Sequence, residues 1–271
     1  MLEFESSIFY FMRNSIFLFL YIAILLTSCA PANGTLPTAT MLPSDTPPPT
    51  QTIVWFPPSA TPTLRTISTY TATPEMNPGI GEILLADDFS DDTVWDIAKS
   101  DQGSAAISRN RLTLAVQPGI YLASVRREIF FDNFYAEITA HTNLCRGDDN
   151  YGILVRAVGS SYYRFVLSCN GLVHVERIKN GTKIIIYEAV PSGDAPLGAP
   201  GEVRIGMWAV GGEMRLFLND RFQFSVVEKT FPSGGFGVFA RSLGSTPVTV
   251  TFSDLTVYDV DYAFPTRTPS P

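Results

Sequence analysis

Acidic side chains are the residues of this sequence with the clearest capacity for metal binding. Asp87, Asp88, Asp91 and Asp92 form one run, and Asp254 lies far downstream in an apolar segment. Carboxylate oxygens of this kind suit Ca²⁺. If the first and last strands of the fold run side by side, Asp87, Asp88 and Asp254 are the ligands we expect. The alternative is that these acids are solvated turn residues.

Catalytic motifs with a fixed local spacing are missing from the sequence. It has no G-x-S-x-G, H-E-x-x-H or C-x-x-C segment, and the two histidines, His141 and His174, lie in separate runs. A glycoside hydrolase needs two carboxyl groups that flank one cleft, and acids from distant strands can meet in space. We therefore assign no catalytic residue and leave enzymatic activity open.

Aromatic and arginine side chains provide the best candidates for a ligand site. A carbohydrate-binding surface combines exposed rings with a few well-placed hydrogen-bonding groups. The candidates are Tyr151, Arg156, Tyr162, Tyr163, Arg164 and Trp208. The competing interpretation is that the rings belong to a β-sandwich core and that the arginines pair with acids.

Three β-hairpins must position most of these candidates. Asn180-Gly181 separates residues 172–179 from 183–187, and Asn-Gly tolerates the positive φ angles of a type I′ turn. Asn219-Asp220 and Gly159-Ser160 separate two further pairs of β-rich runs, 214–218 with 222–226 and 151–158 with 162–169.

More β-rich runs at short spacing complete an all-β pattern. They are residues 135–142, 203–210, 236–241 and 248–257. Short strands with turn signals between them are typical of a β-sandwich or barrel. We predict one domain over residues 81–262, large enough for a substantial core, as two stacked antiparallel sheets.

The N-terminal residues predict export and lipid attachment. Residues 15–26 are apolar throughout, which suits a signal peptide better than a membrane span. The segment Leu26-Thr27-Ser28-Cys29 resembles a bacterial lipobox, which implies cleavage after residue 28. It also implies a lipid on Cys29 with acyl chains such as palmitate. Translation from Met12 would place Arg13 in the n-region. The alternative is an uncleaved anchor with a chance cysteine.

A Pro- and Thr-rich segment follows the cysteine. Its composition predicts a disordered linker over residues 29–80, and residues 263–271 form a similar tail. The formal net charge of -7 gives no electrostatic reason to bind nucleic acid or anionic headgroups. Membrane attachment would therefore depend on the lipid, and the domain would stand outside the cytoplasm at the cell membrane or outer surface.

Three cysteines allow one pair once Cys29 is lipidated. Cys145 and Cys169 remain, and a disulfide between them persists outside the cytosol. Regular pairing around Gly159-Ser160 places Cys169 opposite about Asn150, so a folded-back loop must bring Cys145 closer. The alternative is two buried thiols.

Three segments together resemble the concanavalin A-like lectin/glucanase superfamily, and within it the 3-keto-disaccharide hydrolase-like domains. They are ADDFSDDTVWD (residues 86–96), YGILVRAVGSSYYRFVLSCNG (151–171), and the closing pair GGFGVFARS and VTVTFSDLTVYD (234–259). The turn Leu218-Asn219-Asp220 departs from the Asn-Gly of those domains. The resemblance implies a jelly roll whose concave face often binds carbohydrate.

These observations predict a lipid-anchored extracytoplasmic module that binds carbohydrate or another cell-surface partner without catalysis. One alternative is a glycoside hydrolase or lyase of the 3-keto-disaccharide hydrolase-like type. Another is a structural or adhesion module of the cell envelope. No cofactor is expected apart from the Ca²⁺ considered above.

Overall fold

Fifteen β-strands and one short 3₁₀ helix form the regular structure of residues 75–264, the part of the chain that the computed structural model describes. These residues fall within the unit Thr69–Pro271. Cys29, the signal peptide, residues 29–74 of the linker and most of the C-terminal tail lie outside the described residues. Between residues 75 and 264 no helix has the length and apolar character needed to cross a membrane.

A nine-stranded antiparallel sheet forms one layer. Its order is β13-β12-β11-β6-β15-β4-β3-β2, and β1 pairs with the second half of β15. The strands are β1 (Ile80–Asp87), β2 (Ala98–Lys99), β3 (Gly103–Ile107), β4 (Leu112–Val116), β6 (Phe134–Leu144), β11 (Gly201–Val210), β12 (Glu213–Leu218), β13 (Arg221–Val227) and β15 (Val248–Val260). The 3₁₀ helix η1 (Asp92–Val94) follows β1.

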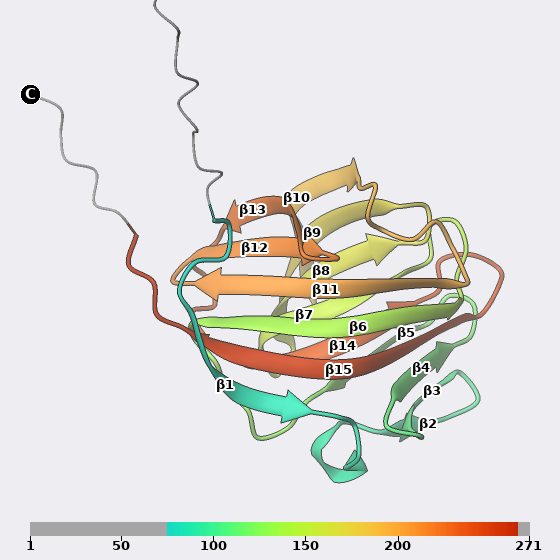
Figure 1. Ribbon diagram of the computed structural model, residues 1–271. Helices are drawn as coiled ribbons and strands as arrows, with labels where there is room; N and C mark the ends of the chain where they lie inside the picture. Colours follow the sequence, from blue (N-terminus) through green and yellow to red (C-terminus); the bar gives the residue numbers. More distant parts are fainter. Residues whose placement is uncertain (1–74, 265–271) are drawn as a thin grey trace, which may run out of the picture. The chain divides into compact units, whose positions relative to one another are not determined.

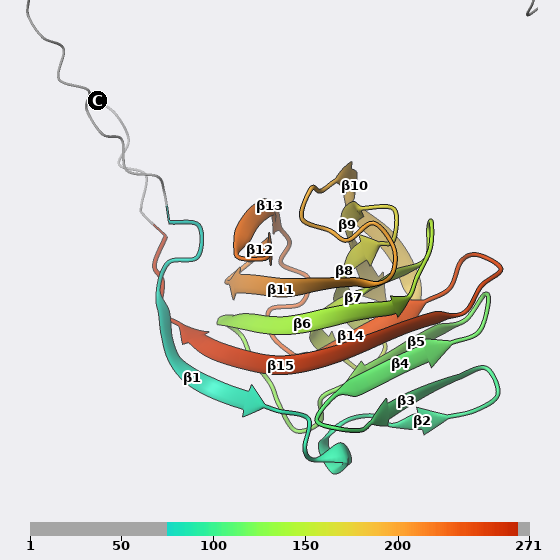
Figure 2. The same ribbon diagram turned by 45° about the vertical axis from the view of Figure 1, so that its right-hand side comes forward.

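A six-stranded antiparallel sheet forms the second layer, in the order β10-β9-β8-β7-β14-β5. Its strands are β5 (Tyr121–Val125), β7 (Asn150–Val158), β8 (Ser161–Ser168), β9 (Leu172–Lys179), β10 (Thr182–Pro191) and β14 (Gly235–Arg241). In Figures 1 and 2, β11, β6 and β15 lie in front of β7, β8 and β14. The predicted all-β jelly-roll sandwich of two antiparallel sheets is confirmed.

The three predicted hairpins are present, and their turns have the expected backbone. Asn180 and Gly181 have φ of 49° and 82° between β9 and β10. Asn219 and Asp220 have φ of 50° and 64° between β12 and β13. Gly159, with φ of 57°, lies in the turn between β7 and β8. Local turn chemistry therefore specified these pairings.

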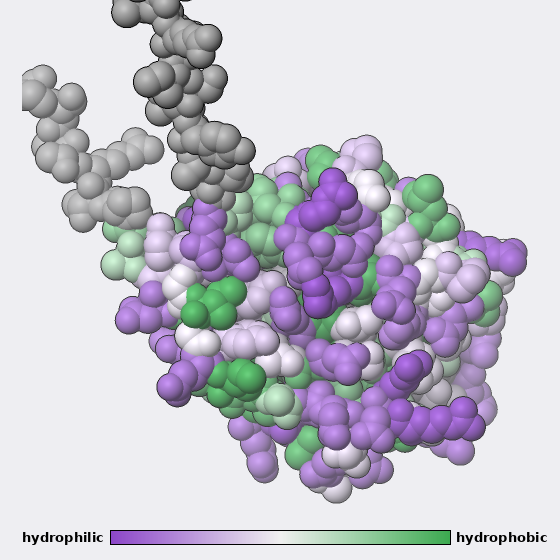
Figure 3. Space-filling view, viewed as in Figure 1, coloured by the Kyte–Doolittle hydropathy of each residue, from purple (hydrophilic) through white to green (hydrophobic). Residues whose placement is uncertain are grey.

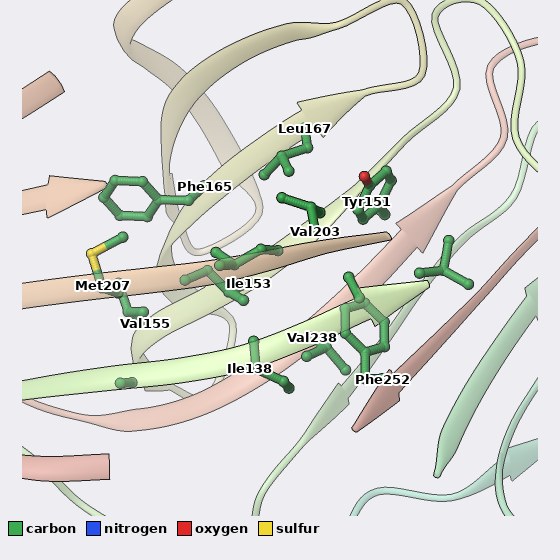
Figure 4. Packing of buried hydrophobic residues seen from close by; sticks show 14 of the residues in the cluster. Ile138, Tyr151, Ile153, Val155, Phe165, Leu167, Val203, Met207, Val238 and Phe252 are labelled. Atoms are coloured by element: carbon green, nitrogen blue, oxygen red, sulfur yellow. The ribbon is translucent and has the colours of Figure 1, made fainter. Parts of the chain in front are cut away.

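The main core lies between the two sheets. Alternation places Leu112, Leu114 and Val116 of β4 inward while Thr113 and Ala115 point outward. Figure 4 shows residues of the nine-stranded sheet packed against residues of the six-stranded sheet, including Ile138, Val203, Met207, Ile153, Phe165 and Val238. Each apolar side chain of this size stabilises the fold by about 1.5–3 kcal/mol relative to an exposed position.

A β-bulge in β7 changes the register expected for the hairpin of β7 and β8, which turns at Gly159-Ser160. Val155 pairs with Tyr163, and the next pair is Val158 with Ser161. Arg156 lies in the extra segment, with φ of 53°. Regular pairing around Gly159-Ser160 would place Arg156 opposite Tyr163, but the bulge inserts an extra residue into β7 and pairs Val155 with Tyr163 instead.

Cys145 and Cys169 are joined as a disulfide, with their Cα atoms 5.8 Å apart. A turn in which the Asp149 amide donates to the Arg146 carbonyl folds the intervening loop back toward β8. The Cys169 amide in turn donates to the Asp149 carbonyl. Asn150 pairs with Ser168 rather than Cys169, a shift of one residue that the bulge explains.

Candidate functional site

The outer face of the six-stranded sheet carries a cluster of polar and aromatic side chains. Along β8, Tyr163, Phe165 and Leu167 belong to the core between the sheets. Tyr162 and Arg164 alternate with them and therefore point to the outer face. His174 and Glu176 reach the same face from β9, and Lys183 and Tyr121 reach it from β10 and β5.

Tyr121 and Tyr162 meet across the outer face of the six-stranded sheet. Their strands, β5 and β8, are separated by β14 and β7, so on a flat sheet the backbones would lie about 14 Å apart. The two hydroxyl oxygens nevertheless lie 3.3 Å apart. The two side chains therefore lean toward each other across β14 and β7, and their rings cover the strands between them.

An apolar floor lies beneath the two tyrosines. Leu154, Val166 and Phe239 are at most 1 % exposed although they belong to the outer face, and Tyr121 and Tyr162 pack against them. The tyrosine rings remain partly exposed. Burial and the contact with Tyr162 raise the pKa of Tyr121 well above its usual value. Its hydroxyl therefore stays protonated and can donate a hydrogen bond.

Arg164 occupies the centre of this face. Its guanidinium carbon lies 5.0 Å from the centroid of the Tyr121 ring and 5.2 Å from that of Phe239. Its Nε donates to Glu176 Oε2 at 2.7 Å, and a second guanidinium nitrogen donates to the same oxygen. Both side chains of the ion pair are less than a tenth exposed. Aromatic rings and a carboxylate therefore hold the planar cation in one orientation.

Glu176 connects the arginine to two groups nearer the solvent. Its Oε1 lies 3.2 Å from His174 Nε2 and 3.2 Å from Lys183 Nζ. Burial alone would raise the pKa of Glu176, but the His174 hydrogen bond and the charge and hydrogen bonds of Arg164 outweigh it and lower the pKa to about 2. Glu176 is therefore a fixed anion that aligns three donors across β8, β9 and β10.

Hydrogen-bonding groups with capacity for a further ligand lie at the edge of this cluster. Lys183 is half exposed, and the buried Nδ1 of His174 has no hydrogen-bond partner among the described residues. Lys183 and the hydroxyls of Tyr121 and Tyr162 are the groups that can bind a molecule rich in hydroxyl groups. The arrangement can orient a polar ligand, and the pKa of its carboxylate, Glu176, is too low for that group to act as a general acid near neutral pH.

Two of the tyrosine candidates belong to the core. Tyr151 and Tyr163 are fully buried on the inner face of the six-stranded sheet, and Figure 4 shows Tyr151 among core side chains. Burial raises the pKa of both hydroxyls. The Tyr163 hydroxyl accepts a hydrogen bond from the Phe231 amide at 2.9 Å, so it supports a loop. Neither side chain can reach a ligand on the outer face.

Arg156 has a structural position as well. It is fully buried, and its guanidinium donates to the carbonyl oxygens of Phe231 at 3.2 Å and Asp132 at 3.0 Å. Burial lowers the pKa of Arg156. The side chain thus ties the bulge of β7 to two loops and does not join Arg164 in one site.

Trp208 lies on the other side of the molecule, on the outer face of the nine-stranded sheet. Its Nε1 donates to the Pro78 carbonyl at 2.9 Å, and the rings of Tyr262 and Phe264 pack against it edge to face. The Arg215 guanidinium lies 4.3 Å from its ring centroid. Trp208 is therefore covered by chain segments and has no exposed ring for a sugar.

The expected calcium ligands do not assemble. β1 and β15 do run side by side, and Asp87 pairs with Leu255. However, the Asp87 carboxylate accepts from Arg126 Nε at 2.8 Å and from Trp95 Nε1 at 3.1 Å. Asp254 accepts from its neighbour Ser253. Within residues 75–264 no group of three or more His, Cys, Asp or Glu side chains could hold a metal ion.

The structure thus brings two of the six ligand candidates, Tyr162 and Arg164, into one surface. Sequence reasoning missed Tyr121, Glu176 and Lys183 and gave His174 no role. The alternation of His174 and Glu176 with Val173 and Val175 was visible in the sequence and could have indicated a shared polar face. Nothing local indicated that Tyr121, some 40 residues upstream, would meet Tyr162, because that contact depends on sheet order.

Comparison with known proteins identifies the fold. No protein-family model matches the sequence, and no curated protein matches it. The carbohydrate binding module CBM66 from Bacillus subtilis aligns with a TM-score of 0.51 and 16% identity, over 61% of this chain and 96% of that one. A structure described as "Prominent members of the human gut microbiota express endo-acting O-glycanases to initiate mucin breakdown" aligns with a TM-score of 0.50 and 10% identity, over 66% and 100%. At these identities the likeness shows the jelly-roll fold alone.

Proposed function

We propose that this chain is a lipid-anchored extracytoplasmic module that binds carbohydrate on the outer face of its six-stranded sheet. The observation that carries the proposal is the buried Arg164–Glu176 pair, which fixes His174 and Lys183 beside two partly exposed tyrosines. Sugars present both hydroxyl groups and apolar ring faces. Fixed donors beside aromatic rings suit such ligands.

The proposed anchoring rests on the sequence. The apolar run 15–26, the lipobox-like Leu26-Thr27-Ser28-Cys29 and the Pro/Thr-rich residues after it are typical of an exported lipoprotein. Mass spectrometry of the mature protein tests the anchor: a lipid on Cys29 supports it, and an unmodified Cys29 with residues 1–28 retained contradicts it.

Carbohydrate binding is tested with the full-length chain in detergent micelles, on a glycan array and in pull-downs with insoluble polysaccharides. Once a glycan is found, Tyr162→Phe removes one hydroxyl and keeps the ring. Lys183→Ser removes the exposed cation. Each should weaken binding about threefold to tenfold, the range for one hydrogen bond.

Lys179→Ser is the matched control. Lys179 is an exposed lysine at the end of β9 that forms no ion pair within residues 75–264. The Lys179→Ser variant should bind the glycan with the same affinity as the wild type. Equal weakening in all three variants would place the ligand elsewhere. If no glycan binds and crosslinking captures a stable protein partner, the adhesion module is favoured instead.

A glycoside hydrolase or lyase similar to the 3-keto-disaccharide hydrolase-like domains is the alternative. The description of the second structural neighbour mentions endo-acting O-glycanases, so the shared fold is compatible with a hydrolase. With a pKa of about 2, Glu176 could serve as an anion but not as a general acid near neutral pH. Release of reducing ends from any array-positive glycan, abolished by Glu176→Gln, would replace the binding proposal with this one.

A further inference from the structure

A hollow lies on the outer face of the nine-stranded sheet, on the opposite side of the sandwich from the Arg164–Glu176 pair. It has a volume of about 540 Å³ and is lined by Ser108, Arg109, Arg111, Thr113 and Thr251. A volume of this size is within the range of small-molecule sites, about 300–1,000 Å³. Figure 1 places β3 and β4 at the lower right of this sheet, and Figure 3 shows mostly hydrophilic residues there.

The floor of the hollow is made of hydroxyl groups from neighbouring strands. Thr113 on β4 pairs with Thr251 on β15, and their Oγ1 atoms lie 3.2 Å apart. Asn143 of β6 donates its Nδ2 to Thr251 Oγ1 at 3.3 Å. Three adjacent strands therefore present a connected polar surface that both donates and accepts hydrogen bonds.

The rim of the hollow is the tight turn between β3 and β4. Ser108 and Arg111 exchange backbone hydrogen bonds of 3.0 and 3.2 Å around Arg109 and Asn110. Both central residues have positive φ, 52° for Arg109 and 59° for Asn110. Asn or Gly adopts this conformation more readily than arginine. Asn110 Nδ2 donates to Asp88 Oδ2 at 3.3 Å, so the turn is held against the end of β1.

The two arginines of the rim form no ion pair with a carboxylate of the described residues, 75–264. Seven other arginines of residues 75–264 form ion pairs with carboxylates. Arg109 and Arg111 form none within the same residues, although the chain as a whole has a net charge of -7. Arg109 has an unfavourable backbone conformation and lies beside Arg111, and neither charge is paired with a carboxylate of residues 75–264. Two such guanidinium groups next to the hydroxyls of Thr113 and Thr251 can bind an oxyanion.

We infer that this hollow binds an acidic saccharide, with a carboxylate or sulfate group on Arg109 and Arg111 and sugar hydroxyls on Ser108, Thr113 and Thr251. The guanidinium fork matches a planar or tetrahedral oxyanion with two parallel hydrogen bonds. The volume exceeds what a bare ion needs, and the hydroxyl floor suits the rest of a sugar. This site is separate from the Arg164–Glu176 face.

Calorimetry with the full-length chain in a non-ionic detergent tests the inference with three probes. Trigalacturonate is the acidic saccharide, maltotriose is the neutral one, and sodium sulfate is the free anion. Trigalacturonate should bind with an affinity that falls as salt rises, and maltotriose should not compete for the hollow. Sulfate that binds as tightly as trigalacturonate would overturn the saccharide assignment.

Two substitutions locate the site. Arg109→Asn suits the backbone of the turn, so it should keep or raise the melting temperature and lower trigalacturonate affinity about tenfold. Arg111→Ser should lower the affinity by a similar factor. Arg146→Ser removes the same charge from an exposed loop residue and should bind as the wild type does. Equal loss in all three variants would mean non-specific charge attraction and would overturn the site.

The test also separates this hollow from the proposed carbohydrate face. Tyr162→Phe and Lys183→Ser should leave trigalacturonate affinity unchanged. If these two variants lose it while Arg109→Asn keeps it, the acidic saccharide belongs to the other face and the inference is wrong.

Discussion

Arg164 and Glu176 pair across β8 and β9, and two guanidinium nitrogens of Arg164 donate to one carboxylate oxygen of Glu176. The remaining carboxylate oxygen faces His174 and Lys183. One buried anion thus orients donors on three neighbouring strands. The geometry of the candidate site depends on this pair more than on any exposed residue.

Acid should destabilise the protein through Glu176. Its folded-state pKa of about 2 lies below the ordinary value of 4.5. Its contribution to stability is therefore present above pH 4.5 and lost as the pH falls toward 2, and it amounts to roughly 3 kcal/mol at most. Urea denaturation between pH 7 and pH 3 measures it. The stability advantage of wild type over Glu176→Gln should shrink across this window, and parallel curves would contradict the prediction.

Gly152 should tolerate no side chain. Its φ is +152°, and a Cβ there would lie 2.1 Å from the Phe165 carbonyl oxygen and 3.2 Å from the Phe239 ring. Gly152→Ala should therefore lower the free energy of unfolding by about 3 kcal/mol. Gly193→Ala is the control, because a Cβ at Gly193 meets no atom within 4 Å. Similar melting temperatures for the two variants would show that the strands near Gly152 can separate freely.

The Cys145–Cys169 bond should contribute measurably to stability. It closes a loop with a sequence separation of 24 residues, for which chain entropy predicts roughly 3 kcal/mol. Non-reducing peptide mapping should recover the linked peptides, and dithiothreitol should lower the melting temperature. A Cys29→Ser protein should respond in the same way. Recovery of both thiols free from unreduced protein would refute the bond.

Trp208 should hold the segment that enters the first strand. Trp208→Phe removes the hydrogen bond to the Pro78 carbonyl, which is worth about 1 kcal/mol. Faster hydrogen exchange in a peptide covering residues 75–80 is the expected result. Trp95→Phe removes a bond to Asp87 instead and should leave exchange in that peptide unchanged. If exchange there does not respond to Trp208→Phe, other contacts secure the segment.

The hairpins were predictable because their signals are local. Asn180-Gly181 and Asn219-Asp220 have the positive φ angles that their residue types favour. The strands β2 to β5 were not anticipated, since short segments such as Ala98–Lys99 become strands only by pairing with a partner. The bulge at Arg156 was equally hidden, because no residue type marks it.

The candidate site was predictable only in part. Tyr162 and Tyr163 are adjacent and have the same side chain, yet Tyr162 lies on the outer face of the six-stranded sheet and Tyr163 lies in the core. Trp208 looked like a sugar platform until Pro78, Tyr262 and Phe264 were seen to cover it. Lipidation of Cys29 and the domain bounds stay predictions.

From its sequence alone, this protein's β-rich character, its alternating strands and its main turns could be determined, because each depends on residues a few positions apart. Which face of each strand meets the other sheet was decided by the tertiary structure. The tertiary structure also decided that Tyr121 contacts Tyr162 and that Thr113 contacts Thr251. The physical reason is that alternation defines two faces of a strand, whereas sheet order and curvature determine what each face contacts.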